Sequence, residues 1–488
     1  MKVFKKPKTL AFMALILVGG IFAAFQSFSP AQGAPTTANF WVDANGGTCS
    51  QQLNSGGAYS DSGACVSIDM AWQRCSPGQT IVVKANANTY LSQRINSISG
   101  TQASPGCRVI GEDGVKIAGL DVRAQYFSME NIIIDVGNSH GYNVSIDADD
   151  VKLQNVSLYG QFISMAVNGN NFMWKDGSFG QNGTTGGIRR CDQYDGQGVW
   201  LDGNGATFDG IRFNPQKAAI NTDPSCGLDN TFHLELIRVQ GAQNLTVKNS
   251  WFLSGSDAGS GHIFVTNTDT SSTAANGLKL INNIFEPVNG SYALQTHTNV
   301  LTCNWQYLYN TFYQPMLLQC TGGSAMWVGN IGSYPGCSGT HIKNVFYRST
   351  AFTCGSDLRV SGSSMSSLGL GSGGKLNTGS PAIDAAEPNT ASDYCTGPDV
   401  GSRDIDNNSR PQGSNCDAGA DEFFTGSTPP QTCSAKQGDV NKDGLVDVFD
   451  LSILLSAYGK PTTECSDINR DGKVDMTDLS MLLTNYGT

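Results

Sequence analysis

The stretch "LKLINNIFE" at residues 278–286 decides the fold of this chain, because its pattern recurs along the sequence. Four residues with strand propensity precede an Asn, and a second short apolar group follows it. Variants of the pattern are "FSMENIIID" (127–135), "VKLQNVSLYG" (151–160), "FMWKDGSFG" (172–180), "LTVKNSWFL" (245–253), "QYLYNTFYQ" (306–314) and "THIKNVFYR" (340–348). Most copies lie roughly 20–35 residues apart, and a repeat of this length indicates a solenoid.

The repeat favours stacked coils of short parallel strands. One coil cannot bury its apolar side chains alone, whereas stacked coils bury them continuously. The residues that interrupt each copy tolerate a sharp bend and can bond to their neighbours in the stack; they are Asn131, Asn155, Asp176, Asn249, Asn282, Asn310 and Asn344. We therefore expect a mainly β chain with a right-handed parallel β-helix over residues 66–379. A β-sandwich is the alternative, but its turns come more evenly, every 8–12 residues or so.

The stretch "CVSIDMAWQRCSPGQTIVV" (65–83) lies just upstream of the repeats. Val66, Met70 and Ala71 suit a short amphipathic helix that ends before Pro77-Gly78. We expect this helix to cover the N-terminal end of the stack, which would otherwise expose strand edges. We expect residues 34–65 to form an N-terminal extension that precedes the β-helix.

The N-terminus indicates export. Residues 1–33 contain four Lys, an uncharged apolar run from Leu10 to Phe25 and a small-residue cleavage site at Ala31-Gln32-Gly33, which is typical of a signal peptide. An uncleaved membrane anchor is the alternative, although the apolar run is short for a bilayer span. The rest of the chain holds 26 basic and 41 acidic residues, a net charge of −15, so we expect no nucleic-acid partner. A secreted or cell-surface protein is expected.

The chain has 14 Cys, all after the predicted signal peptide. An even number in an exported chain indicates disulfides, and no CxxC motif points to a zinc or redox site. Pairing between sequence neighbours gives Cys49–Cys65, Cys75–Cys107, Cys191–Cys226, Cys303–Cys320, Cys337–Cys354, Cys395–Cys416 and Cys433–Cys465. The sequence alone does not establish this connectivity.

Two acidic loops near the C-terminus have the spacing of calcium ligands. They read "DVNKDGLVDVFD" (439–450) and "DINRDGKVDMTD" (467–478), and each is followed by a short apolar segment typical of a helix. Oxygen donors fall at positions 1, 3, 5, 9 and 12, a Gly at position 6 permits the turn, and position 7 offers its backbone carbonyl. The predicted ligands are Asp439, Asn441, Asp443, Leu445, Asp447 and Asp450, and Asp467, Asn469, Asp471, Lys473, Asp475 and Asp478. Two Ca²⁺ sites in a small all-α domain are expected, against the alternative of solvated acidic turns.

The capping segment, "GQTIVV" (78–83), the coil "RVIGEDGVKIAGL" (108–120) and the Asn-punctuated coils together resemble the right-handed parallel β-helix proteins related to pectate lyases. The resemblance implies a polysaccharide-active protein, without a specific activity. Residues 380–424 contain "SPAID" (380–384), Arg410-Pro411 and "CDAGA" (416–420), and they resemble the choice-of-anchor tail of bacterial surface β-helices. This similarity implies a segment that closes the last coil.

After a linker at residues 425–432, residues 433–488 resemble a type I dockerin. The resemblance implies docking on a cohesin-like or other surface receptor. Positions 10 and 11 of the loops are Val448-Phe449 and Met476-Thr477, and only Thr477 matches the small hydroxyl residues common there in that family. A standard cohesin is therefore doubtful as the partner.

Polar residues that interrupt the repeats are the candidates for a site. Strand alternation predicts that Leu234 and Leu236 point inward and that His233, Glu235 and His262 share an outer surface column. The catalytic candidates are Glu235, His233, Asp202, His262 and Arg238, and the substrate-binding candidates are Trp200 and Asn267. The alternative is that all of these are ordinary exterior residues.

Three function classes follow. The first is a glycoside hydrolase or polysaccharide lyase with a docking tail, since paired carboxylates hydrolyse glycosides and a base with Arg and Ca²⁺ suits β-elimination on uronates. The second is a non-catalytic glycan-binding or adhesive protein, and the third is a structural component of a surface assembly. A Ser–His–Asp hydrolase is disfavoured because no GxSxG motif occurs.

Overall fold

The computed structural model describes residues 35–486 with gaps. The gaps are residues 51–55, 86–88, 98–103, 105, 138–142, 161–163, 181–183, 186–196, 218–234, 255–260, 267–275, 288–291, 298–299, 301–302, 320–322, 334–338, 349–353, 362–363, 387–393, 424–437, 441–445, 447, 460–464 and 469–473. The predicted signal peptide and linker lie outside the described residues.

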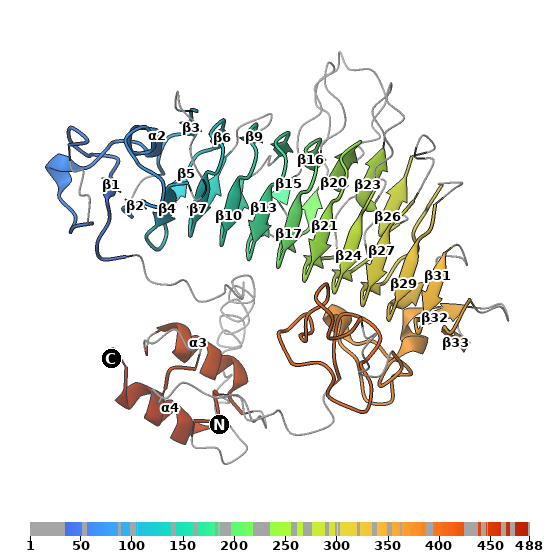
Figure 1. The fold of residues 1–488 in the computed structure, drawn as a ribbon. Coiled ribbons are helices and arrows are strands. Elements are labelled where there is room, and N and C mark those ends of the chain that lie inside the picture. The colour runs from blue at the N-terminus through green and yellow to red at the C-terminus, as the bar shows by residue number, and fades with distance from the viewer. Residues whose placement is uncertain are drawn as a thin grey trace, which may run out of the picture.

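Three long parallel sheets form the body of the protein, and their strands follow one another along an axis (Figure 1). Sheet 1 contains β1 (Phe40–Val42), β2 (Thr80–Val83), β4 (Arg108–Gly111), β7 (Ser128–Glu130), β10 (Lys152–Gln154), β13 (Met173–Lys175), β17 (Thr207–Asp209), β21 (Thr246–Lys248), β24 (Lys279–Ile281), β27 (Gln306–Leu308), β29 (Met326–Val328) and β31 (Thr340–Ile342). Sheet 2 contains β5 (Lys116–Ile117), β8 (Ile133–Asp135), β11 (Ser157–Tyr159), β14 (Ser178–Phe179), β18 (Arg212–Phe213), β22 (Trp251–Phe252), β25 (Ile284–Phe285), β28 (Thr311–Phe312), β30 (Ile331–Ser333), β32 (Val345–Arg348) and β33 (Leu358–Ser361).

Sheet 3 contains β3 (Gln93–Ile95), β6 (Leu120–Val122), β9 (Val144–Ile146), β12 (Met165–Val167), β16 (Gln197–Leu201), β20 (Glu235–Gln240), β23 (Gly261–Thr266) and β26 (Leu294–Thr296). The strands β15 (Thr184–Thr185) and β19 (Gln216–Lys217) form a small separate pair. From β4 to β26 the chain runs from sheet 1 to sheet 2 to sheet 3 in each coil, and the described strands from β27 onward belong to sheets 1 and 2 alone. This is the predicted right-handed parallel β-helix. Since β1 pairs in parallel with β2, the predicted N-terminal extension contributes a strand to sheet 1.

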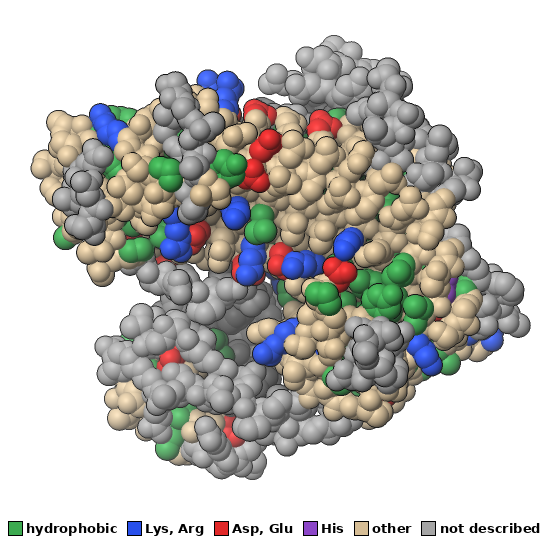
Figure 2. All heavy atoms as spheres, in the orientation of Figure 1, with side chains coloured by type: hydrophobic (Ala, Val, Ile, Leu, Met, Phe, Trp, Pro, Cys, Tyr) green, Lys and Arg blue, Asp and Glu red, His purple; other side chains and the backbone are tan. Residues whose placement is uncertain are grey.

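Alternation divides each strand between the core and the surface. Inward rings of sheet 2 form a continuous stack, with centroids 4.5 Å apart for Phe252 and Phe285 and 5.0 Å apart for Phe285 and Phe312. On the face in view, Lys and Arg side chains lie beside Asp and Glu (Figure 2). One such pair joins Arg108 Nη2 to Glu130 Oε2 at 2.6 Å. A stack of aromatic rings thus lines the core at sheet 2, and several charged side chains on the surface pair with an opposite charge.

The corner between sheets 1 and 2 is only two residues long, for example Asn282 and Asn283 between β24 and β25. The first corner residue is left-handed in successive coils, and this conformation suits Asn and Gly. Its φ is 55° at Asn131, 48° at Asn155 and 55° at Asn282. The prediction that Asn tolerates the bend is confirmed for these residues.

The second corner residue carries a buried amide ladder. Asn310, Asn330 and Asn344 each accept at Oδ1 from both the backbone N–H and the Nδ2 of the Asn in the preceding coil. These three residues and Asn283 are fully buried. The Nδ2–Oδ1 distances are 3.0 Å for Asn283–Asn310, 3.0 Å for Asn310–Asn330, 2.8 Å for Asn330–Asn344 and 2.7 Å for Asn344–Asp357. Asn310 and Asn344 therefore occupy a different corner position from Asn131 or Asn282, although the sequence pattern treated them as equivalent.

The helix α2 (Ile68–Trp72) packs at the N-terminal end of the stack beside β1, β2 and β3, as predicted (Figure 1). Ser67 caps it by accepting a hydrogen bond from Met70 N. Ile68, Ala71 and Trp72 are its buried residues, and the Trp72 ring meets Phe127 edge-on at 5.2 Å. The 3-10 helix η1 (Asp61–Gly63) precedes it.

Disulfides join Cys49 to Cys65, Cys75 to Cys107 and Cys395 to Cys416, which confirms three predicted pairs. Cys303, Cys354 and Cys465 are also disulfide-bonded. The other predicted pairs each include a cysteine outside the described residues.

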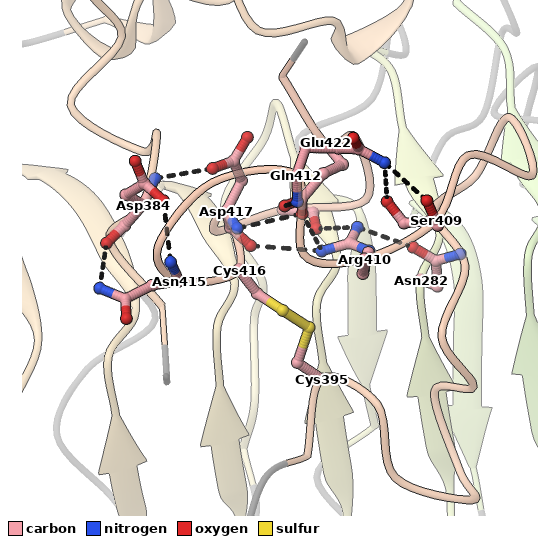
Figure 3. Close-up of a disulfide and its surroundings, with 11 residues drawn as sticks. Asn282, Asp384, Cys395, Ser409, Arg410, Gln412, Asn415, Cys416, Asp417 and Glu422 are labelled. Atoms are coloured by element: carbon pink, nitrogen blue, oxygen red, sulfur yellow. Dashed lines mark hydrogen bonds and ion pairs between the residues drawn. A yellow bond between two sulfur atoms is a disulfide. The ribbon is translucent and has the colours of Figure 1, made fainter. Parts of the chain in front are cut away.

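Residues 380–423, which we call the flanking segment, follow the 3-10 helices η3 (Met365–Leu368) and η4 (Ser372–Gly374). They pack along the side of the last coils (Figure 3). Arg410 is buried, and its Nη2 donates to Asn282 Oδ1 at 3.2 Å and to Gly419 O at 2.8 Å. Its Nη1 lies 3.4 Å from Glu422 Oε2, so the guanidinium anchors this segment to the Asn corner.

The C-terminal unit contains α3 (Val448–Ala457) and α4 (Met476–Thr484), which pack on each other. Its core joins residues 28 positions apart, Val446 with Val474 and Leu454 with Leu482. Asp475 caps α4 through a reciprocal capping box with Asp478. This repeated arrangement agrees with the predicted small all-α domain.

We predict that Asn330→Ala lowers the free energy of unfolding of the β-helix by about 3 kcal/mol or more, because buried ladder donors and acceptors lose their partners. Chemical denaturation followed by fluorescence measures the change. Asn45→Ala, at an exposed residue, serves as the control and should change the stability by less than about 0.5 kcal/mol. Equal stability of the two variants would contradict the structural role of the ladder.

Candidate functional site

The outward face of sheet 3 carries the most distinctive group of side chains. The register aligns Trp200 of β16, Arg238 of β20, Phe264 of β23 and Gln295 of β26 in one row. The residues that alternate with them along the strands, such as Ile237, are buried in the core. We call Trp200, Arg238 and Phe264 the aromatic–arginine row.

Arg238 lies between two aromatic rings. Its Cζ is 5.1 Å from the centroid of Trp200 and 5.4 Å from that of Phe264, which are cation–π distances. The His297 ring meets Phe264 edge-on at 6.4 Å. The sequence identified Trp200 and Arg238 but missed Phe264 and His297. Strand alternation from Val265 would have placed Phe264 outward, but nothing local linked it to Trp200.

Asp202 directly follows β16 and lies two residues after Trp200, so it continues the outward side of that strand. It is exposed. The Trp200 Nε1 donates a hydrogen bond to Asp202 Oδ2 at 2.9 Å. Loss of solvent around the carboxyl raises the pKa of Asp202, and the hydrogen bond from Trp200 opposes this shift by favouring the charged form. Asp202 is therefore a carboxyl group with a perturbed pKa beside the aromatic–arginine row.

Charged groups on the N-terminal part of the same face are mutually paired. Asp121 accepts from Arg94 Nε at 2.7 Å and lies 3.2 Å from Arg123 Nη2. Asp147 accepts from Asn168 Nδ2 at 2.6 Å, and Asn168 is the residue one coil before Asp202. These groups extend a polar surface from the row along the axis.

The predicted orientation of Glu235 is wrong. Glu235 is buried, in phase with the inward Ile237 and Val239, so Arg238 points outward instead. Leu236 is buried in the core as predicted, but Glu235 and Ile237 on either side of it are buried too, so the alternation along β20 is regular only from Ile237 onward. The predicted surface column of His233, Glu235 and His262 is therefore not formed by its described members.

The predicted outward orientation of His262 is also wrong. Its ring is fully buried, 5.3 Å from Phe252 and 6.1 Å from Phe285 of sheet 2, and its Nε2 lies 2.7 Å from Glu286 O. At the beginning of β23 the strand meets the corner, where the neighbouring sheet buries a side chain that alternation alone assigns outward. His233 and Asn267 lie outside the described residues.

The two acidic loops place their described carboxylates inside the C-terminal unit. Asp439 and Asp467 at loop position 1 are each 3% exposed, and Asp450 and Asp478 at position 12 are fully buried. Asp450 Oδ1 accepts from Val440 N at 2.7 Å, and Asp478 Oδ2 accepts from Asp475 N at 2.9 Å. The predicted ligands Asn441, Asp443, Leu445, Asp447, Asn469, Asp471 and Lys473 lie outside the described residues.

This donor set fits a hard divalent cation. Buried carboxylates need a compensating charge, and no Lys, Arg or His occurs in the described part of the unit. Asp439, Asp450, Asp467, Asp475 and Asp478 are the described residues that would hold Ca²⁺, with oxygen ligands of the type it prefers.

Residues 437–486 match the family described as the type I dockerin domain. Repeat spacing, paired helices and buried acidic loops agree with that assignment, so the chain carries a dockerin domain at its C-terminal end. Proteins of this family bind calcium and cohesins. A search of curated proteins finds no match to the chain.

Solved structures with a related architecture include pectate lyase Pel9A, at 11% identity and a TM-score of 0.42 over 79% of this chain and 96% of that one. A rhamnogalacturonan lyase shows 12% identity and a TM-score of 0.32 over 62% and 83% of the two chains. The A-module of mannuronan C-5 epimerase AlgE4 from Azotobacter vinelandii shows 13% identity and a TM-score of 0.18 over 51% and 91%. No helix within the described residues is long and apolar enough to span a membrane.

Burial lowers the pKa of His262 to about 4 from its usual 6.5, because its charged form is desolvated. Between these pH values the unfolded chain binds more protons than the folded one. The stability contributed by neutral His262 is thus present above pH 6.5 and is lost as the pH falls towards 4, up to about 3 kcal/mol. Denaturation curves between pH 4 and 7 should show a flatter pH dependence for His262→Gln than for the wild type. An unchanged slope would contradict the burial of a neutral imidazole.

Chelation of Ca²⁺ should unfold the dockerin domain and leave the β-helix folded, because the acidic loops lose the charge that compensates their carboxylates. Calorimetry of the full chain with and without EDTA measures this, with the Asp439→Asn, Asp467→Asn double variant reproducing the effect of EDTA. A cation at a thousand times its Kd adds about 4 kcal/mol of stability. Identical melting curves with and without the chelator would contradict calcium-dependent folding.

Proposed function

We propose that the chain is a secreted polysaccharide-active protein, tethered through its dockerin domain to a cohesin-like or other surface receptor. The aromatic–arginine row is the observation that carries the glycan-binding part of this proposal. Trp200 and Phe264 lie two coils apart, about 10 Å along the axis, which is the length of a disaccharide in an extended glycan. The half-buried Trp200 ring offers an apolar surface to a sugar ring and has polar neighbours within reach. Phe264 is only 8% exposed and supports Arg238 from the other side.

Asp202 is the best-placed acid for hydrolysis. Desolvation raises the pKa of Asp202, which is the direction that a general acid requires. Asp147 follows β9 as Asp202 follows β16, two coils away, and it accepts hydrogen bonds from Asn168 Nδ2 and, at 3.1 Å, Ser145 Oγ. Carboxylates separated by two coil spacings, about 10 Å between backbones, leave room for a water and suit an inverting hydrolase.

A non-catalytic glycan-binding protein is the second candidate function. The burial of Glu235 and His262 favours it, because it removes two of the predicted catalytic groups from the surface. Binding to polysaccharide without product release would distinguish this function from the first.

The docking surface of the dockerin domain is supported by exposed apolar residues at equivalent positions of its two halves. Leu455 is 51% exposed and Leu483 is 52% exposed, and Tyr458 and Tyr486 are exposed in the same relation. Apolar side chains exposed on so small a unit favour contact with a partner.

Reducing-end release and absorbance of unsaturated uronates, measured on a panel of polysaccharides, test the catalytic proposal. We expect Asp202→Asn to lower the turnover at least 100-fold while binding persists, since proton transfer by a positioned group contributes about 10²–10⁴-fold. Trp200→Ala should weaken binding, whereas Lys152→Ala, on the exposed face of sheet 1, serves as the control. Unaltered turnover in Asp202→Asn would remove Asp202 from the mechanism.

A further inference from the structure

We propose that Arg238 is a receptor for an oxyanion substituent of the bound glycan, a carboxylate or a sulfate ester. This inference rests on the proposed glycan-binding function of the outward face of sheet 3 and names the chemistry of its ligand.

The two rings flanking Arg238 leave only part of the guanidinium for a ligand. Trp200 and Phe264 lie on adjacent coils at either side, each with its ring within 5.4 Å of Cζ. Ring contacts on both sides restrict the guanidinium, and the hydrogen bonds among the described residues leave its N–H groups without an acceptor. A guanidinium restricted in this way suits bidentate binding of an oxyanion, because two parallel N–H groups match two oxygens.

The charge of Arg238 is uncompensated within the described structure. No ion pair or hydrogen bond of its guanidinium is found there, and its Nε is shielded from solvent without an acceptor. By contrast, Arg94 and Arg123 on the same sheet pair with Asp121, and Arg410 pairs with Glu422. A partly desolvated cation without a protein partner is costly unless a ligand supplies the anion.

The nearby carboxyl group does not serve as that partner. Asp202 accepts from the Trp200 indole N–H, and the described ion pairs do not join it to Arg238. Trp200 therefore separates a cationic position from an acidic one on the same face. A glycan with an anionic substituent would place that group against Arg238 and a neighbouring glycosidic bond towards Asp202.

Binding of the calcium-loaded full chain to four polymers tests the inference. The probes are polygalacturonate, its fully methyl-esterified form, a sulfated galactan and the same galactan after desulfation. We expect one anionic polymer to bind at least tenfold more tightly than its neutral counterpart, which also tells carboxylate from sulfate. Arg238→Gln should abolish that preference, and Arg238→Lys should restore it in part because Lys lacks the bidentate fork.

Arg108→Gln is the matched control, since Arg108 lies on sheet 1 and pairs with Glu130. Melting curves confirm that each variant is folded. Equal binding of charged and neutral polymers, or an unchanged preference in Arg238→Gln, would overturn the role of Arg238 and leave the proposed function intact. Absence of binding to every glycan of the wider panel would instead overturn the proposed function, and this inference with it.

Discussion

The two-residue corner between sheets 1 and 2 is the constraint on which the rest of the structure depends. A turn this short requires a left-handed residue in coil after coil, and the next residue must satisfy its buried polar groups without water. Asn283, Asn310, Asn330 and Asn344 meet the second requirement by bonding to one another, and the carboxylate of Asp357 accepts the last amide. The ladder keeps successive coils in register, so positions far apart in sequence align along the axis.

That register creates the candidate site. Trp200, Arg238 and Phe264 come from three coils, and only the stacking of β16, β20 and β23 brings them into one row. The inward residues of the same strands are committed to the core, whereas the outward ones are free to vary without loss of packing. A β-helix therefore offers a long surface on which polar and aromatic groups can be arranged at a spacing close to that of a sugar chain.

The two parts of the protein reach stability by different means. The β-helix buries a continuous apolar core and carries disulfides, and Arg410 anchors the flanking segment to its side through Asn282. The dockerin domain has a core of a few residues and buries the carboxylates of Asp439, Asp450, Asp467 and Asp478, so we expect its folding to depend on a cation. The proposed tethering and the proposed glycan binding would therefore respond to different conditions, although both belong to one chain.

The sequence by itself determined the features that are local or periodic. The repeated coils, the α2 cap and the paired acidic loops all follow from spacing within short stretches. The three confirmed disulfides join sequence neighbours, but the sequence left their connectivity open. Only the tertiary structure decided the phase of β20, which buries Glu235 and exposes Arg238, and the fate of His262 at a corner. Alternation fixes which residues of a strand share a face, but it does not fix which of the two faces is buried. A shift of the strand by one residue exchanges the faces, and the packing of neighbouring coils decides between the two arrangements.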